Sequence, residues 1–365
     1  MTARAESRIA PPAATRRARP IAGAMVAAAG VVMLATVVLS LSLGATGITL
    51  DAVPRVVASY LGGIEPMTTE EVRERLVILE IRLPRTAMGL LVGSALALSG
   101  AVMQGLFRNP LADPGLIGVS SGSALAAVAV IALGDGLLAP VVDALGAFAV
   151  PISAFVGGLI ATALLYQLAT RAGYTSIATL LLAGIALGAL AGAITGIIVF
   201  GSDDRELRDL TFWSLGSLGG ASWQKIGAAL PFLVAALVLM PYLVRVLNGF
   251  LLGEAEAGHL GVETETAKRI AMVGVAGAVG AAVAVSGVIG FVGIVVPHIV
   301  RLVTGPDHRY VLPGSALLGG ALLLAADSVA RVIVAPAELP IGIVTALFGA
   351  PFFLWLLMRR RGGLG

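Results

Sequence analysis

The sequence lacks cysteine entirely, and only 12% of its 365 residues are charged. The absence of cysteine excludes disulfides, catalytic thiolates, and metal or iron–sulfur centres held by cysteine. Soluble globular proteins contain about 25% charged residues, whereas disordered chains combine high net charge with few apolar residues. With 58% hydrophobic residues and a mean hydropathy of +0.98, the composition is typical of an integral membrane protein. Long continuous apolar runs predict an all-α protein, because strands of a membrane β-barrel alternate over about ten residues.

The few charged residues exclude further classes of function. A net charge of +3 without a basic stripe gives no indication of nucleic-acid binding. The two lysines, Lys225 and Lys268, lie outside any G-x-x-x-x-G-K-[ST] frame, so ATP hydrolysis would require another polypeptide. His259, His298 and His308 lack the spacing of a zinc site, and we expect neither a metal nor another cofactor on this chain. No nucleophile and base occur together, so we expect no catalytic activity.

An ion-coupled secondary transporter is the alternative from a different class, and such proteins usually keep Asp, Glu or His within their membrane spans. The predicted spans are almost free of these residues. Asp327 comes closest, near the end of the ninth span, and it precedes Arg331 by four residues, where a helix-end ion pair is expected. The pathway therefore suits a bulky, chelated or largely apolar cargo better than a bare metal ion.

Ten apolar runs predict membrane-spanning helices, each of which needs roughly 20 apolar residues. The first run is longer than the core of about 7–15 residues that a secretory signal has, and the eighth is short enough for a partial span. We predict a single ten-helix transmembrane domain over residues 21–358, between a disordered tail at 1–20 and a C-terminal tail at 359–365. The runs are 21–43, 86–106, 115–133, 148–170, 176–200, 226–246, 269–285, 288–302, 311–329 and 341–358.

The distribution of positive charge predicts the orientation, because cytoplasmic loops are enriched in Lys and Arg. With the termini inside, fifteen of the 24 basic residues lie on the inner side and nine on the outer side. Arginine clusters also flank both ends of the chain, at 16–19 and 359–361. Both termini are therefore expected in the cytoplasm, with the chain in contact with membrane lipid.

Two segments stand out for their composition. The fifth run carries glycines at four-residue spacing, at Gly184, Gly188, Gly192 and Gly196, which lets another helix approach closely. The longest inner loop, 248–268, is amphiphilic and punctuated by glycine. Such a loop is either a solvated connector or a docking surface for a separate ATPase.

Three strings together resemble the permease subunits of ATP-binding-cassette importers for iron chelates, haem and cobalamin. They are RLPRTAMGLLVGSALALSGAVMQGLFRNPLADPGLIGVSSGSAL from Arg82, GFVGIVVPHIVRLVTGPDHRYVLPGSALLGGALLLAADSVAR from Gly290, and ELPIGIVTALFGAPFFLWLL from Glu338. The resemblance covers nearly all of the chain after residue 20. It implies a type II importer in a bacterial cell (inner) membrane, with a cobalamin-permease-like bundle of about ten helices per subunit.

The resemblance also implies partners and functional residues. Two permease subunits would form a homodimer, with two ATPase subunits, which hold ATP and magnesium, on the cytoplasmic side and a substrate-binding protein outside. External arginines corresponding to Arg82, Arg85 and Arg331 would receive acidic residues of the binding protein, since guanidinium groups match carboxylates bidentately.

The segment between 251 and 264 resembles the coupling helices that contact the ATPase. Its residues are Gly253, Glu254, Ala255, Glu256, Ala257, Gly258, His259, Leu260 and Gly261, and we expect Gly258-His259 to shorten the helix. The connection that contains Gly173, Tyr174, Thr175 and Ser176 resembles the cytoplasmic gate.

The substrate is the least specified property. The segment SDDRELRDLTFWSLGSLGGASW, residues 202–223, looks most like haem permeases of this family. Methionines at Met88, Met103 and Met240 would tolerate a porphyrin in an apolar pathway, although most methionines of such a chain serve packing. We expect haem as the substrate first, a ferric siderophore second and cobalamin last.

Overall fold

The computed structural model describes residues 13–43, 48, 51–171, 174–334 and 337–361. Helix α1 (Ala13–Ser42) begins within the segment expected to be a disordered tail, so that expectation fails for 13–20, while residues 1–12 lie outside the described residues. Extending an existing helix over alanine and arginine needs no new nucleus, and both residues favour helix. At the other end, helix α16 (Ile341–Arg361) continues into the expected C-terminal tail for the same reason.

All ten predicted apolar runs are helical. Six helices are long and apolar enough to cross a membrane, and the pair α10 and α11, bent by 47°, forms a seventh candidate span. The remaining three, α5, α14 and α16, are shorter, and α14, with 13 residues, corresponds to the short eighth run. Besides α1 and α16, the helices are α4 (Leu83–Leu106), α5 (Val119–Leu133), α7 (Ala149–Ala169), α8 (Ile177–Phe200), α10 (Trp223–Val238), α11 (Met240–Phe250), α13 (Thr264–Ser286), α14 (Val292–Thr304) and α15 (His308–Ile333).

Shorter elements connect these helices. Asn109-Pro110 and Asp113-Pro114 end the second predicted span, as expected, and Asp113 caps the 3₁₀ turn η2 by accepting from the Gly115 N–H at 2.7 Å. Burial raises the pKa of the Asp113 carboxyl. The other elements are α2 (Ala52–Leu61), α3 (Thr69–Leu76), the π-helical η1 (Val77–Arg82), η2 (Pro114–Ile117), α6 (Ala139–Leu145), η3 (Gly146–Phe148), α9 (Asp204–Ser214), α12 (Glu254–His259), β1 (Thr170–Arg171) and β2 (Tyr174–Thr175).

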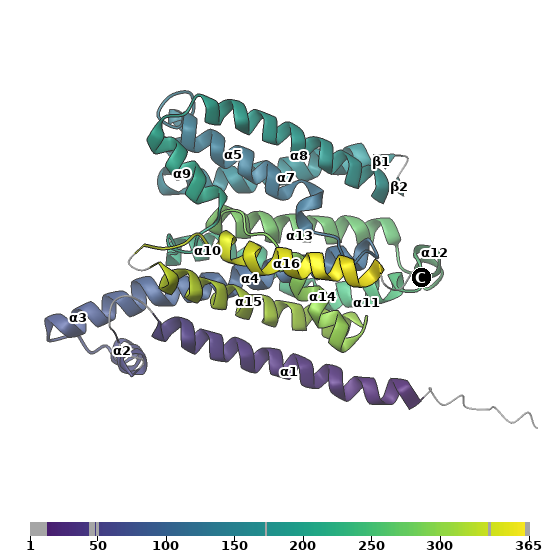
Figure 1. Cartoon of the computed structure of the whole chain (residues 1–365), viewed down its shortest axis with the longest axis horizontal. Helices are drawn as coiled ribbons and strands as arrows, with labels where there is room; N and C mark the ends of the chain where they lie inside the picture. Colours follow the sequence, from purple (N-terminus) through teal and green to yellow (C-terminus); the bar gives the residue numbers. More distant parts are fainter. Residues whose placement is uncertain (1–12, 44–47, 49–50, 172–173, 335–336, 362–365) are drawn as a thin grey trace, which may run out of the picture.

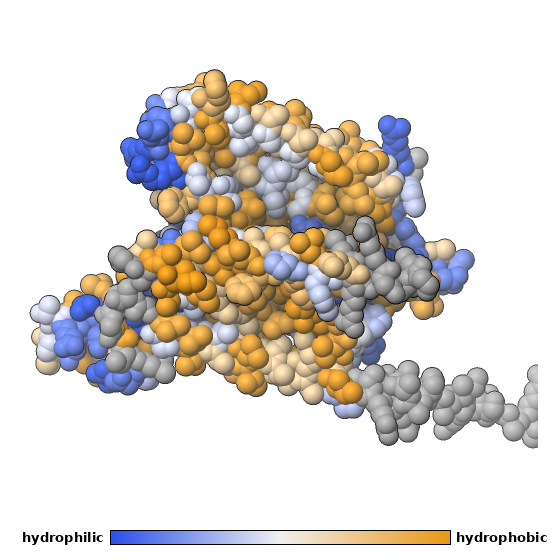
Figure 2. Space-filling view, in the orientation of Figure 1, coloured by the Kyte–Doolittle hydropathy of each residue, from blue (hydrophilic) through white to orange (hydrophobic). Residues whose placement is uncertain are grey.

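The long helices run side by side (Figure 1), and hydrophilic residues gather at both ends of the bundle (Figure 2). One end carries the antiparallel β1–β2 hairpin and α12, and we call it the hairpin end. The opposite end carries α2, α3 and α9, and we call it the α3 end. Helix α1 begins and α16 finishes at the hairpin end. Apolar side chains cover the surface between the two polar ends, as a membrane-embedded body requires (Figure 2).

Helix α4 forms the centre of the core and packs against α13, α14 and α15. Glycine permits two very close approaches along it. A Cβ on Gly93 would lie 2.4 Å from the Gly319 carbonyl oxygen of α15, and a Cβ on Gly100 would lie 1.8 Å from the Gly293 carbonyl oxygen of α14. Because backbones touch here, the central helices form one stiff unit.

Helix α8, which carries the predicted glycine stripe, is mostly exposed in the single chain. Gly184 packs closely, since its Cβ would lie 2.3 Å from the Leu116 carbonyl oxygen. A Cβ on Gly188 would only reach a single side-chain oxygen at 4.0 Å, and Gly192 and Gly196 would meet nothing within 4 Å. Within the described chain, the predicted helix packing is therefore present at the start of the stripe and absent at its end.

Candidate docking and coupling sites at the two ends

At the α3 end, Arg85 forms the centre of a buried charge cluster. Its Nε donates to both carboxylate oxygens of Asp327 at 3.1 and 3.2 Å, and its Nη2 donates to Oδ1 at 2.9 Å. Its Nη1 donates to Glu338 at 2.7 Å. The Asp327 side chain is 1% exposed, whereas that of Glu338 is 46% exposed. Arg85 thus joins α4 to α15 internally and to the loop before α16 at the surface.

The other two predicted arginines cap the last turn of α1. Arg82 Nη1 donates to the Leu41 carbonyl at 2.6 Å, and Arg331 Nη1 donates to the Leu43 carbonyl at 3.1 Å. Arg331 also pairs with Asp327, at 3.0 Å between Nε and Oδ2. Basic side chains satisfy the open carbonyls of a helix C-terminus and oppose its negative dipole end. The arginines therefore hold α1 against α4 and α15.

The structure brings the three predicted docking arginines together, but not as exposed groups. Arg82 and Arg85 are 3% and 8% exposed, and the Arg331 side chain is 8% exposed. Their guanidinium groups already contact carbonyls and carboxylates of this chain. The predicted Asp327–Arg331 ion pair is present, although it is buried rather than solvated. Reception of a partner's carboxylates by these arginines stays a prediction.

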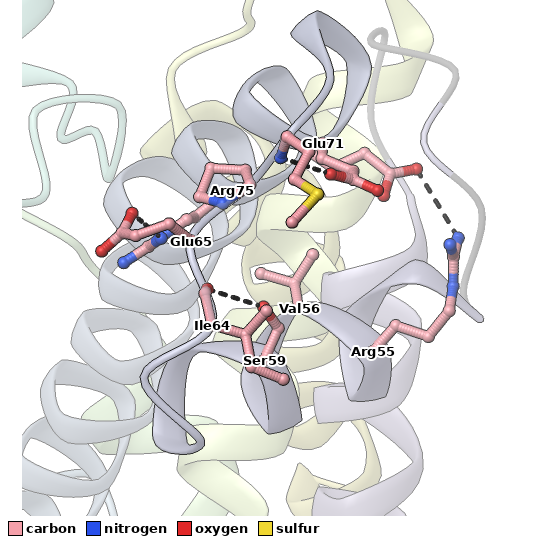
Figure 3. Close-up of a pocket in the computed structure, with 10 residues that line it drawn as sticks. Arg55, Val56, Ser59, Ile64, Glu65, Glu71 and Arg75 are labelled. Atoms are coloured by element: carbon pink, nitrogen blue, oxygen red, sulfur yellow. Dashed lines mark hydrogen bonds and ion pairs between the residues drawn. The ribbon is translucent and has the colours of Figure 1, made fainter.

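A pocket of about 280 Å³ lies between α2 and α3 at the same end (Figure 3). Arg75 reaches from α3 to Glu65 at 2.8 Å, and Arg55 reaches from α2 to Glu74 at 3.7 Å. Glu71 forms a capping box with Thr68 at the start of α3. The charges of this segment were assigned to the outer side from the sequence, but its two helices were not predicted. The alternation of acidic and basic residues over 65–82 is the signal that could have indicated a separate charged module.

At the hairpin end, α12 forms the exposed helix expected for the coupling segment. It is six residues long and lies between Gly253, with φ of +120°, and Gly261, with φ of +85°. Ala257 anchors it in the core, whereas Leu260 is 67% exposed. The short length agrees with the expected effect of Gly258-His259. Its contact with an ATPase stays a prediction.

The predicted gate segment forms the turn between α7 and α8. Tyr174 and Thr175 make up β2 and pair with Arg171 and Thr170, and Ser176 caps α8 by accepting from the Thr179 N–H at 3.3 Å. Gly173 lies outside the described residues. The hairpin is therefore joined directly to the start of the exposed span α8.

A buried lysine, which was not among the predicted site residues, lies between α12 and the hairpin. Lys268, in the second turn of α13, is 2% exposed. Its Nζ donates to Glu254 of α12 and, at 2.8 Å, to Glu265. It also lies 4.9 Å from the centre of the Tyr174 ring. The i, i+3 spacing of Glu265 and Lys268 was visible in the sequence, but the contacts to the other two elements were not.

The described residues contain no group of three His, Asp or Glu side chains that could hold a metal ion. The expectation of no metal or cofactor on this chain stays a prediction.

A bundle of long apolar helices with polar elements at both ends has the architecture of a membrane transport subunit. Residues 22–359 match the FecCD transport family, and the chain belongs to that family as a permease of the ATP-binding-cassette importer class. The hemin transport system permease HmuU of Yersinia pestis is 49% identical over 78% of this chain and 83% of its own length. The cobalamin import permease BtuC of Halobacterium salinarum is 42% identical over 94% of this chain and 98% of its own length.

A solved structure, described as an inward-facing conformation of a metal-chelate type ABC transporter, superposes with a TM-score of 0.76. It is 32% identical and covers 92% of this chain and 99% of its own. The predicted fold is thus confirmed as a type II importer permease, a multi-pass membrane protein.

Proposed function

We propose that this chain is the non-catalytic permease subunit through which haem crosses a bacterial inner membrane, driven by ATP hydrolysed on a partner subunit. The observation that carries the choice of haem is the 49% identity to the hemin permease. The test is uptake by vesicles that contain the permease, its ATPase and its binding protein, with ATP inside. Haem should accumulate with ATP and fail to accumulate with a non-hydrolysable analogue. Uptake that follows a proton or sodium gradient without ATP would instead indicate an ion-coupled transporter.

Cobalamin is the second candidate, because its Halobacterium permease matches almost the whole chain. Ferric siderophores are a third, consistent with the metal-chelate transporter of the same fold. Competition in the same vesicles separates the three substrates. Excess unlabelled haem should abolish uptake of labelled haem, whereas cyanocobalamin and a ferric siderophore should not. Uptake of labelled cobalamin with no uptake of haem would reverse the assignment.

The proposal includes a homodimer with two ATPase subunits and one external binding protein. The chain has no phosphate-binding loop of its own, which supports a separate ATPase. In the part of α8 around Gly192 and Gly196, an added Cβ would meet nothing within 4 Å in the described chain, which supports contact with a second copy of the chain, because small residues allow close helix packing in lipid. Mass measurement of the detergent-solubilised permease, alone and with its ATPase, tests the stoichiometry.

For the orientation, we propose that the hairpin end faces the cytoplasm and the α3 end faces outward, following the charge distribution. The chain has no cysteine, so single cysteines can be introduced without background. Glu70→Cys on α3 should react with a membrane-impermeant maleimide on intact spheroplasts. Glu256→Cys on α12 should react only after permeabilisation. The opposite pattern would contradict the orientation.

For docking of the binding protein, we propose that Arg85 exchanges Glu338 for a carboxylate of the partner. Glu338 is the half-exposed member of the cluster, so its release costs less than separation of Arg85 from buried Asp327. Glu338→Gln removes the internal competitor and should tighten binding of the binding protein, most clearly at low salt. Glu65→Gln, at the neighbouring exposed ion pair, is the control and should leave affinity unchanged. Weaker binding of Glu338→Gln would contradict the exchange.

A further inference from the structure

The contacts around Lys268 join three elements that are separate in sequence. Glu254 begins α12, Glu265 lies in the first turn of α13, and Tyr174 belongs to the hairpin. Lys268 contacts all three with one ammonium group. A buried ammonium is costly without hydrogen-bonding partners, so its two carboxylates and the aromatic ring fix its position.

Glu265 extends this contact into the backbone of the hairpin. Its Oε1 accepts from Lys268, and its Oε2 accepts from the Thr175 N–H at 3.1 Å and from the Thr175 hydroxyl at 2.8 Å. Thr175 is 2% exposed and also hydrogen-bonds Thr170 at 3.0 Å. The Ser176 N–H then donates to Ala169 at 3.0 Å, directly before α8 begins. A displacement of Glu265 is therefore transmitted to the backbone at the start of α8.

We propose that Lys268 is a positioning residue through which α12 controls the β1–β2 hairpin. Among the hydrogen bonds and ion pairs of the described residues, the sequence Glu254–Lys268–Glu265–Thr175 is the one that leads from α12 to the hairpin. The inference rests on the proposed function, with an ATPase at the hairpin end, and on the predicted contact of α12 with that ATPase. It adds the identity of the side chains that carry the movement of the ATPase to α8.

The charge balance gives the expected effect of breaking the contact. One lysine lies between two carboxylates, so Lys268→Met leaves Glu254 and Glu265 facing each other without a cation. Like charges at close range repel, and α12 should move away from the hairpin. Glu254→Gln is the milder variant, because it releases α12 and keeps the Lys268–Glu265–Thr175 contacts. The control is Lys225→Met, which changes the only other lysine, at the start of α10, where Nζ donates to the Gly220 carbonyl.

The first measurement concerns the permease alone. Arg171→Cys in β1 and Glu256→Cys in α12 both replace exposed residues, and spin labels on them report the separation of the two elements. The parent and Lys225→Met should give one narrow distance distribution. Lys268→Met and Glu254→Gln should give a broader distribution shifted to longer distance. A distribution for both variants that matches the parent would overturn the inference.

The second measurement uses the complete complex in vesicles. Substrate transported per ATP hydrolysed should fall about tenfold in Lys268→Met, in the range typical of coupling between sites, while the ATPase rate persists. Lys268→Arg should restore part of the ratio, because it restores the cation. An unchanged ratio in Lys268→Met would contradict the role of Lys268. A parent complex that transports no substrate would contradict the proposed function instead, and the spin-label distances would still test the contact.

Discussion

The two ends of the molecule hold their charges in different ways. At the α3 end, Arg85, Asp327 and Arg331 connect long helices, and their partners are up to 291 residues apart in sequence. At the hairpin end, Lys268 connects a six-residue helix to two-residue strands. A network between large packed helices moves only if the core moves. A network between small surface elements can open with little loss of packing. We therefore expect the α3 end to stay rigid and call its Arg85–Asp327–Arg331 network the clamp. We expect the hairpin end to move more easily and call its Lys268 network the joint.

Removal of the central carboxylate of the clamp should have the largest effect. Asp327→Ala leaves Arg85 and Arg331 buried without their shared partner, which typically costs about 3–5 kcal/mol. The thermal unfolding temperature of the purified permease should fall strongly. Glu338→Ala, at the half-exposed partner of Arg85, is the control and should lower the unfolding temperature far less. Equal losses would show that the clamp does not depend on burial.

The difference between the rigid α3 end and the more mobile hairpin end also requires a stiff helix bundle between them. Gly100→Ala forces a methyl group against the Gly293 carbonyl, and overpacking of this kind costs about 1–3 kcal/mol. The unfolding temperature should decrease, whereas Gly227→Ala in α10, where a Cβ would meet nothing within 4 Å, should leave the unfolding temperature unchanged. A tolerated Gly100→Ala would mean that α4 and α14 separate easily.

Weakening the joint should have a smaller and local effect. Thr175→Val removes the hydroxyl that donates to Glu265, a contact worth about 1.5–3 kcal/mol because the acceptor is charged. Because the hairpin is a small element at the surface, we expect it to open without the core, which gives faster hydrogen exchange in 170–176 and an unchanged global unfolding temperature. Thr179→Val is the matched control. Among the hydrogen bonds of the described residues, the exposed Thr179 hydroxyl contacts only Ser176. A global decrease in stability would show that the hairpin belongs to the rigid body.

The smallest effect is expected at the exposed ion pair of the α2–α3 module. Arg75→Gln removes the contact with Glu65, and exposed pairs contribute about 0–1 kcal/mol. The loss of stability caused by Arg75→Gln should be smaller still at high salt. A large salt-independent loss would indicate that the stacking of Arg75 over Tyr60, at 5.4 Å, matters more than the charge.

Hydropathy was sufficient to predict where the apolar helices lie, because a helix in lipid must be apolar along its whole length, although only six of them, or seven with the bent pair, are long enough to span a membrane. The same rule missed α2 and α3, which are too short to span a membrane. Helix α2 is amphipathic and buries Ala52 and Val56 in a small apolar cluster, whereas α3 is polar and obtains its order from a capping box and ion pairs. The rule also predicted α1 to begin too late, since a polar helix can continue beyond the membrane.

The sites were harder to predict because the decisive contacts are long-range. Asp327 and Arg331 were recognised as a pair from their four-residue spacing, but Arg85 lies 242 residues from Asp327, and nothing in the sequence relates the two. External arginines were expected to be exposed, since charged residues are rarely buried without a partner. The partner in this case was Asp327. Lys268 was counted only as an inner-side charge, because α12 and the hairpin meet it only in the folded chain.

The capping of α1 by Arg331 has a consequence for how the protein is made. Leu43 is synthesised 288 residues before the arginine that satisfies its carbonyl, and α1 packs mainly on α15 and α14, which are also late in the chain. Helix α1 must therefore enter the membrane while only Arg82, of the arginines that cap its last turn, has been synthesised. A nascent chain that stops before α15 would leave most of the packing surface of α1 without its partner.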